Sequence, residues 1–337
     1  MLSVINTGKG ELKNIYLDRP SPGAGEVLLK ILQCGICGSD IQIYHGLHPY
    51  AKQPLVMGHE CVAEVIESGS DVTEILTGDL VTVQPQIFCN KCSECSSGHT
   101  NVCKNMQFMG VHIDGFFSEY VVVPAWNVLK LDKKMDHDAA MLVEPVAVTI
   151  NAAKRGGVQH GMRVLVIGAG TIGNLTAQVC RQRGAEVVIT DIQDSKLALA
   201  GNCGILHCVN TSRTDLRVCI EKGVNGKKFD LIVDCAAIPS VFEEIVQYIP
   251  GGSGIAVVGN YKQKIKVDLS KIQRKEINVY GVMQYSREEF SCAIQMLKNG
   301  EIKVKEIISA RFPLEKLNDA FTYISGHPET MKVAVMI

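Results

Sequence analysis

The feature that most constrains the fold is a glycine-rich loop in the middle of the chain. The apolar run RVLVIG, residues 163–168, is short and rich in β-branched residues, as expected of a buried parallel strand. It continues through GAGTIG into a helical pattern over residues 174–183. A GxGxxG sequence is weak evidence alone, but between a strand and a helix it predicts a dinucleotide-binding loop. The expected cofactor contacts in this loop are Gly168, Gly170, Thr171, Ile172 and Gly173.

Each glycine has a distinct purpose in such a loop. The first makes the turn, the second lets the backbone approach a pyrophosphate, and the third lets helix and strand pack closely. The helix N-terminus then offers free N–H groups to the phosphates. A second strand, EVVITD, ends at Asp191, 18 residues after Gly173. A carboxylate there binds both ribose hydroxyls and repels a 2′-phosphate, which favours NAD over NADP.

Further short apolar runs alternate with helical stretches in the same region. They are LIVDCAA at 231–237, GIAVVG at 254–259 and NVYGVM at 278–283. This alternation is typical of a doubly wound α/β fold with a parallel sheet, the Rossmann type. Ala236, near the end of the first run, is a further expected cofactor contact.

Length and composition restrict the remaining possibilities. The chain has 337 residues, too many for one ordinary core, so we expect more than one domain. Its net charge of -1 does not indicate the positively charged surface that binding to nucleic acid or to an anionic membrane requires. No uninterrupted apolar run is long enough to span a membrane, and no signal-peptide core follows Met1. We therefore expect a cytoplasmic protein.

Four cysteines, Cys89, Cys92, Cys95 and Cys103, lie within fifteen residues. A reducing cytoplasm and the odd total of 13 cysteines argue against a disulfide framework. Clustered thiolates need a cation, and Zn²⁺ accepts four sulfurs in a tetrahedron. An iron–sulfur run has related spacing but ends in Cys-Pro, which is absent here. We favour zinc, and because four ligands leave no position for a substrate, the site is expected to be structural.

A second set of candidate ligands is spread over the first half of the chain. Cys37 lies in GICGSD, His59 and Glu60 lie in GHE, and Glu144 lies in LVEP. Singly, each is an ordinary residue. Together, a thiolate, an imidazole and carboxylates suit a zinc ion that keeps one position for water or substrate.

In their order along the chain, these motifs resemble the zinc-dependent medium-chain dehydrogenases over essentially its whole length. The resemblance implies that Cys37, His59 and a carboxylate hold a catalytic zinc, with Ser39 as the hydroxyl nearest the reacting oxygen. In the polyol and threonine dehydrogenase branch, a Glu in an EP dipeptide replaces a third cysteine, and Glu144 matches it. Glu60 matches an acid that binds the metal directly or through water. Two zinc ions per chain, one catalytic and one structural, follow.

The resemblance also implies an architecture. Residues 1–146 would form a GroES-like, partly open β-barrel catalytic domain, and residues 147–283 a Rossmann NAD-binding domain. Residues 284–337 would return to the first domain, with KVAVMI at 332–337 as its closing strand. Family members place the active site in the cleft between the domains. They also form homo-oligomers, so we expect a dimer or tetramer.

Three positions depart from the family pattern. Gln42 stands where many members have a relay histidine, and an amide cannot shuttle a proton. His45 is a candidate for a rerouted relay. Ala63 and Phe116 stand where relatives have glycine, which predicts altered packing without the loss of a ligand.

The resemblance implies an NAD-dependent oxidation in which zinc lowers the pKa of a substrate hydroxyl and Ser39 relays its proton. Several stretches, GVHIDGFFSEY among them, look most like dehydrogenases of sugar acids such as gulonate or galactonate. Those relatives carry an arginine near residues 282–284, which are Val, Met and Gln here. Candidate replacements for that arginine are Lys52 and Arg287, and candidate cleft residues are His112 and Glu119. A neutral polyol such as sorbitol, a threonine-type substrate and an NAD-binding sensor without turnover remain alternatives.

Overall fold

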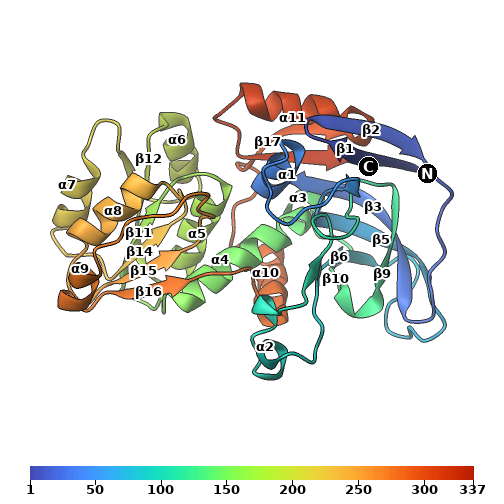
Figure 1. Cartoon of the computed structure of the whole chain (residues 1–337), viewed down its shortest axis with the longest axis horizontal. Helices are drawn as coiled ribbons and strands as arrows, with labels where there is room; N and C mark the ends of the chain where they lie inside the picture. Colours follow the sequence, from blue (N-terminus) through green and yellow to red (C-terminus); the bar gives the residue numbers. More distant parts are fainter. The chain divides into compact units, whose positions relative to one another are not determined.

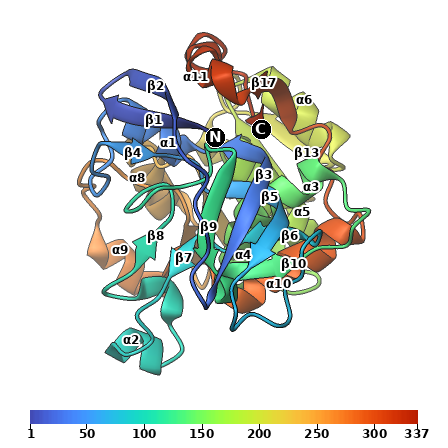
Figure 2. The same cartoon turned by 90° about the vertical axis from the view of Figure 1, so that its right-hand side faces the viewer.

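The computed structural model describes residues 1–337 as two compact units. Unit 1 contains Met1–Glu144, Ser286–Gly300 and Ile308–Ile337, and unit 2 contains Pro145–Tyr285 and Glu301–Ile307. Figures 1 and 2 show the elements of both units. No helix is long and apolar enough to cross a membrane. The assignment of catalytic and cofactor domains to residues 1–146, 147–283 and 284–337 stays a prediction.

Unit 1 is built around a seven-stranded sheet in the order β10-β6-β5-β3-β18-β17, with β9 also pairing with β3. A three-stranded sheet, β2-β1-β4, and the pair β7-β8 complete its strands. The bounds are β1 Leu2–Gly8, β2 Glu11–Tyr16, β3 Glu26–Ile36, β4 Leu55–Val56, β5 Glu60–Ser68, β6 Leu80–Val83, β7 Gln86–Ile87, β8 Gln107–Phe108, β9 Tyr120–Pro124, β10 Val128–Lys130, β17 Ile308–Pro313 and β18 Lys332–Met336. Its helices are α1 Gly38–Tyr44, α2 Ser93–Ser96, α3 His137–Met141, α10 Arg287–Lys298 and α11 Leu317–Gly326, with 3₁₀ turns at Thr100–Val102, Ala125–Asn127 and Leu314–Lys316.

Strand β3 is the centre of unit 1. It pairs antiparallel with β5, β9 and β18, and eight of its eleven residues are buried. The register sets Gly35 opposite Glu60 on one side and opposite Ala334 on the other. The predicted closing strand is therefore confirmed as β18, which brings the end of the chain beside its early part.

Unit 2 contains a six-stranded parallel sheet in the order β13-β12-β11-β14-β15-β16. The strands are β11 Arg163–Ile167, β12 Glu186–Asp191, β13 His207–Asn210, β14 Leu231–Asp234, β15 Gly254–Val257 and β16 Asn278–Gly281. The helices are α5 Thr171–Gln182, α6 Asp194–Asn202, α7 Leu216–Lys222, α8 Pro239–Tyr248 and α9 Leu269–Arg274, and α4, Val143–Arg155, begins in unit 1 and runs into unit 2. The predicted doubly wound sheet is confirmed. Its strand order reverses between β11 and β14, and such switch points bind ligands at the carboxyl ends of the strands.

Candidate metal centres and cofactor loop

The four-cysteine cluster forms on the loop after β7, where α2 and a 3₁₀ turn fold the chain back on itself. The four sulfur atoms lie within 4.8 Å of one another. Two of the separations are 3.5 Å, between Cys89 and Cys103, and 3.8 Å, between Cys92 and Cys103. Four sulfurs around a tetrahedral Zn²⁺ are about 3.8 Å apart, given a Zn–S bond of about 2.3 Å. No cysteine in the chain is in a disulfide, so the cluster fits a structural zinc site.

The thiols of this cluster are not equivalent. The backbone N–H of Lys91 is the main cause that lowers the pKa of Cys89 to about 6. Desolvation, followed by hydrogen bonds to neighbouring thiols, raises the pKa of Cys95 to about 12. Four adjacent thiols cannot all ionise without a cation, and a bound metal resolves this conflict by taking them as thiolates.

The second cluster combines Cys37, His59 and Glu60, whose ligand atoms also lie within 4.8 Å of one another. Cys37 precedes α1, and the other two residues stand at the start of β5. His59 and Glu60 are buried, and Cys37 is half-buried. A thiolate, an imidazole and a carboxylate are ligands that an open zinc site uses. The donor set therefore fits zinc.

Glu144, in the first turn of α4, is buried as well. It does not lie within 4.8 Å of all three members of the cluster. Its negative charge nevertheless acts on Lys332, which contacts Glu60. The structure thus brings three of the four predicted ligands together and places the fourth carboxylate in the same buried region.

Asp40, for which the sequence analysis predicts no function, contacts the loop of Cys37 and the segment of His59. Its Oδ2 accepts the Cys37 N–H at 2.8 Å, and its Oδ1 accepts the Gly58 N–H at 3.2 Å. Oδ1 also lies 3.6 Å from Nδ1 of His59. Burial alone would lower the pKa of His59, but the charges of Asp40 and Cys37 raise it well above its ordinary value. A carboxylate behind Nδ1 orients the ring for a metal at Nε2.

Ser39 lies next to the imidazole of this cluster. Its Oγ is 3.4 Å from Nε2 of His59, so the predicted proton-relay hydroxyl lies beside the candidate metal ligands. Gln42 occupies α1, and His45 ends that helix with its ring edge-on to Tyr44 at 5.2 Å. The assignment of a relay to His45 stays a prediction.

A buried ion pair holds Glu60 from the other side. Nζ of Lys332 donates to both carboxylate oxygens of Glu60, at 2.6 and 2.7 Å, and to the Ile36 carbonyl at 3.1 Å. Burial alone would lower the pKa of Lys332, but the charges of Glu60, Cys37 and Glu144 raise it. Gly35 leaves space for the pair, because a Cβ there would lie 2.2 Å from a Glu60 oxygen. In the sequence, Lys332 is the one charged residue of the apolar run KVAVMI, and this pattern could have singled it out as a buried charge.

The other proposed substrate-side residues have separate positions within unit 1. Arg287 donates to the Trp126 carbonyl at 2.6 Å, and Glu119 accepts the Leu2 N–H at 2.6 Å. Lys52 is exposed. His112 lies closer to the cluster, because its Nδ1 accepts the N–H of Phe108, whose ring packs edge-on against His59 at 5.4 Å.

The two packing departures are confirmed as interior positions. Ala63 in β5 and Phe116 are both fully buried. Neither carries a metal-binding atom, so these changes affect the filling of the core alone.

The glycine-rich loop of unit 2 has the geometry that its sequence predicts. Gly168, between β11 and α5, has a φ of +93°, a conformation that favours glycine. A Cβ on Gly173 would lie 1.7 Å from the Gly168 carbonyl oxygen, so only glycine permits this close approach of helix and turn. A Cβ on Gly170 would meet no atom within 4 Å. Gly170 is the N-cap of α5, and Thr171 and Ile172 begin the helix.

Two acids organise the surroundings of this loop. Asp191, at the end of β12, accepts the Ala169 N–H at 2.7 Å and the Gln193 N–H at 3.0 Å. Asp234, at the end of β14, accepts the Ala236 N–H at 3.0 Å.

Ala236 is held against the glycine turn. A Cβ on Gly168 would lie 3.3 Å from the Ala236 nitrogen. Asp234 also accepts the N–H of Ala237, which has a φ of +53°, and the hydroxyl of Tyr261 donates to the second Asp234 oxygen. The sequence had given no function to Asp234 or Tyr261.

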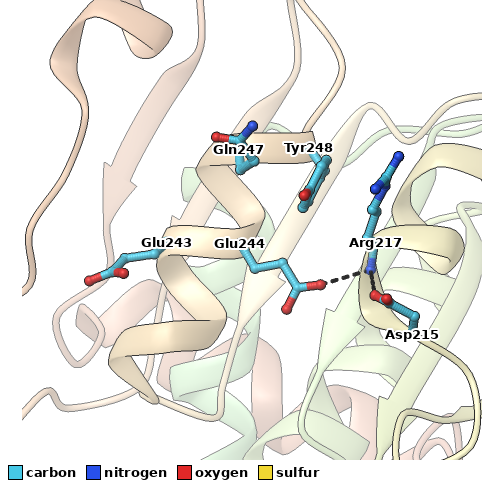
Figure 3. Close-up of a pocket in the computed structure, with 6 residues that line it drawn as sticks. All are labelled: Asp215, Arg217, Glu243, Glu244, Gln247 and Tyr248. Atoms are coloured by element: carbon cyan, nitrogen blue, oxygen red, sulfur yellow. Dashed lines mark hydrogen bonds between the residues drawn. The ribbon is translucent and has the colours of Figure 1, made fainter.

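A surface hollow between α7 and α8 is lined by three acidic side chains together with an arginine, a glutamine and a tyrosine, as Figure 3 shows. They are Asp215, Glu243, Glu244, Arg217, Gln247 and Tyr248. Asp215 and Glu244 both accept the backbone N–H of Arg217, at 2.8 and 2.9 Å. The Arg217 guanidinium lies over the Tyr248 ring at 5.1 Å. These carboxylates cap α7, and they form no group of candidate metal ligands.

Comparison with known proteins agrees with both halves of this description. Residues 23–133 match the model of the alcohol dehydrogenase GroES-like domain, and residues 171–299 match that of the zinc-binding dehydrogenase. The starvation-sensing protein RspB of Escherichia coli K12 is 34% identical over 96% of this chain and 95% of its own length. The L-galactonate-5-dehydrogenase of the same organism is 31% identical over 90% of this chain and 88% of its own length. Among solved structures, an rspB alcohol dehydrogenase from E. coli CFT073, complexed with NADH, matches with a TM-score of 0.94 at 32% identity, covering 100% of this chain and 99% of that one.

Proposed function

Because the chain belongs to the family of zinc-binding alcohol dehydrogenases, with a GroES-like domain and a Rossmann-type fold, we propose that it oxidises a secondary alcohol of a sugar acid with NAD. The observation that carries this proposal is the buried cluster of Cys37, His59 and Glu60, whose donor types fit an open zinc site. Support for a sugar acid comes from two relatives in E. coli, an L-galactonate-5-dehydrogenase and an L-idonate 5-dehydrogenase of known structure.

In this proposal Cys37, His59 and Glu60 hold the catalytic zinc, with Glu144 as the alternative carboxylate. A bound zinc ion acts as a Lewis acid that lowers the pKa of an alcohol, and NAD accepts the hydride. Asp40 keeps the His59 ring oriented, because it binds the loop of Cys37 and faces Nδ1 of the imidazole. Oγ of Ser39, which lies beside Nε2 of His59, would relay the hydroxyl proton, accepting it while it passes its own proton on towards solvent.

The cofactor would be bound by unit 2. Backbone N–H groups at the start of α5 face the phosphates, and Gly170 leaves space for them because nothing lies near its missing Cβ. Asp191 binds the adenosine ribose hydroxyls, and Ala236 lines the loop beside Gly168. The four-cysteine cluster holds a second, structural zinc. A cytoplasmic location and a dimeric or tetrameric state stay predictions.

NADH formation tests the proposal. Zinc-loaded protein is assayed with L-galactonate, L-gulonate and L-idonate, and in parallel with sorbitol and L-threonine. We expect turnover of at least one sugar acid, lost in Cys37→Ser and retained in Cys292→Ser, which changes an exposed cysteine outside both clusters. Turnover of sorbitol alone or of L-threonine alone would contradict the sugar-acid proposal and identify the protein as a polyol or a threonine dehydrogenase.

A second candidate function has one specific observation in its favour. The relative RspB is described as a starvation-sensing protein, which keeps open an NAD(H)-binding sensor. Tight NADH binding by zinc-loaded protein, with no turnover of any alcohol in the panel, would support the sensor and contradict the dehydrogenase.

A further inference from the structure

Two histidines near the candidate catalytic cluster, His48 and His112, each accept a backbone N–H at Nδ1, which determines the ring nitrogen that carries the proton. His48 lies on the loop after α1, and its Nδ1 accepts the N–H of Ala51 at 3.2 Å and of Tyr50 at 3.4 Å. His112 lies between β8 and β9, and its Nδ1 accepts the Phe108 N–H at 3.0 Å. A nitrogen that accepts an N–H cannot carry a proton, so each neutral ring is protonated at Nε2.

The surroundings of both rings lower their pKa and so favour the neutral imidazole. Burial is the main cause that lowers the pKa of His48, and the nearby His112 lowers it further. Burial also lowers the pKa of His112. Each imidazole therefore offers one Nε2–H donor, and neither donor has an acceptor within the protein.

The two histidines belong to one wall of aromatic rings. The Tyr50 ring centre lies 6.1 Å from that of His48 and 6.4 Å from that of His112. Tyr50 is 70% exposed, so this wall faces solvent. It adjoins the candidate metal ligands, because the Phe108 that binds His112 packs against His59, and because His48 responds to the charges of Asp40 and His59.

We infer that His48 and His112 form a subsite that binds the carboxylate of a sugar-acid substrate. This inference rests on the proposed function and deepens it. The two Nε2–H groups are donors only, and a carboxylate is an acceptor only, so the two match without a rearrangement of protons. Hydrogen bonds to a charged acceptor are about twice as strong as neutral ones. Tyr50 supplies a ring against which the C–H groups of the carbon chain pack.

The variants His48→Asn and His112→Asn remove the Nε2–H donor while keeping an acceptor at the position of Nδ1. The amide oxygen of Asn can occupy the place of Nδ1 and keep the backbone N–H bonds, whereas the Nε2–H is lost. The variants His48→Gln and His112→Gln do the opposite, because they can restore a terminal N–H while losing the Nδ1 acceptor. His137→Asn, at an exposed histidine that begins α3, is the matched control.

The experiment compares KM for an aldonate with KM for the polyol of the same carbon chain, using zinc-loaded full-length protein. We expect the aldonate KM to rise roughly tenfold to hundredfold in each Asn variant. Polyol KM and NADH affinity should change less than about twofold, and the Gln variants should recover part of the loss. NADH affinity and the thermal unfolding midpoint verify that each variant is folded.

The outcomes separate the two proposals. An unchanged aldonate KM in the Asn variants, or an equal rise for aldonate and polyol, overturns the carboxylate subsite and leaves the dehydrogenase standing. If wild-type protein oxidises neither substrate, the proposed function fails, and calorimetric titration with the aldonate decides the subsite. Binding to wild type that is lost in the Asn variants supports the subsite, and equal binding or none overturns it.

Discussion

At the scale of single residues, the buried pair of Lys332 and Glu60 makes the sharpest energetic prediction. Both side chains are almost fully buried, and Nζ contacts both carboxylate oxygens. In metal-free protein, Lys332→Met leaves the buried Glu60 carboxylate without its partner, which costs about 3–5 kcal/mol. We expect the free energy of unfolding of unit 1 to fall by about that amount in urea titration. The double variant Glu60→Gln/Lys332→Met should recover most of it, and a single variant as stable as wild type would contradict the prediction.

The same pair predicts how stability depends on alkaline pH. The negative charges around Lys332 outweigh its burial and raise its pKa above the ordinary 10.5. A lysine with a raised pKa stabilises the fold fully below its unfolded pKa, and this contribution is lost as pH rises through the folded pKa. We therefore expect the unfolding midpoint of wild type to fall above about pH 10.5, and the fall to be smaller in Glu60→Gln/Lys332→Met. Parallel curves for the two proteins would show that Lys332 does not cause it.

Asp191 makes a residue-scale prediction about the choice of cofactor. Its carboxylate accepts two backbone N–H groups, one from the glycine-rich loop, so it is fixed beside that loop. Asp191→Asn keeps an acceptor oxygen but removes the charge that repels a 2′-phosphate. We expect the ratio of kcat/KM for NADP to that for NAD to rise at least tenfold, measured with one substrate. A ratio that stays at the wild-type value would show that Asp191 does not determine the preference for NAD over NADP.

At the scale of elements, two glycines of one loop separate folding from cofactor binding. Gly173→Ala forces a Cβ to 1.7 Å from the Gly168 carbonyl, so α5 must move away from β11. We expect unit 2 to unfold at lower urea and to lose NADH binding. Gly170→Ala meets no protein atom, so its stability should match wild type, whereas NADH affinity falls because the methyl group occupies phosphate space. NADH fluorescence titration and urea curves of both variants test this, and equal behaviour of the two would refute it.

The same elements show what the sequence could and could not predict. The strand runs at 163–168 and 186–191 are confirmed within a residue because their apolar pattern and bounding turns are local. The runs at 231–237 and 254–259 end earlier, at Asp234 and Val257, since the loops beyond leave the sheet. The sequence does not reveal the function of Lys332 because its partner is 272 residues away, and the two meet only because β3 pairs with β18 on one edge and with β5 on the other.

At the scale of the whole molecule, we expect that loss of the metal from one cluster of ligands leaves the metal of the other cluster in place. The four-cysteine loop is closed by four sulfurs, whereas Cys37 is hydrogen-bonded to the carboxylate of Asp40 and Glu60 is paired with the ammonium group of Lys332. A structural site contributes folding energy, and an open site contributes chemistry. The two metal losses should therefore have different consequences for the same chain.

We expect wild-type protein to carry two zinc ions per chain, and the variants Cys37→Ser and Cys92→Ser to carry about one each. Cys92→Ser should lower the thermal unfolding midpoint by several degrees, because the loop around α2 loses the ion that neutralises its thiols. Cys37→Ser should abolish alcohol oxidation while its midpoint stays close to wild type, since Asp40, His59 and the Glu60–Lys332 pair still hold that region together. Elemental analysis, thermal unfolding and NADH formation on the same samples measure all three quantities. If Cys92→Ser lost both ions, the catalytic site would depend on the four-cysteine site for its structure. That result would contradict the prediction that the two clusters are independent.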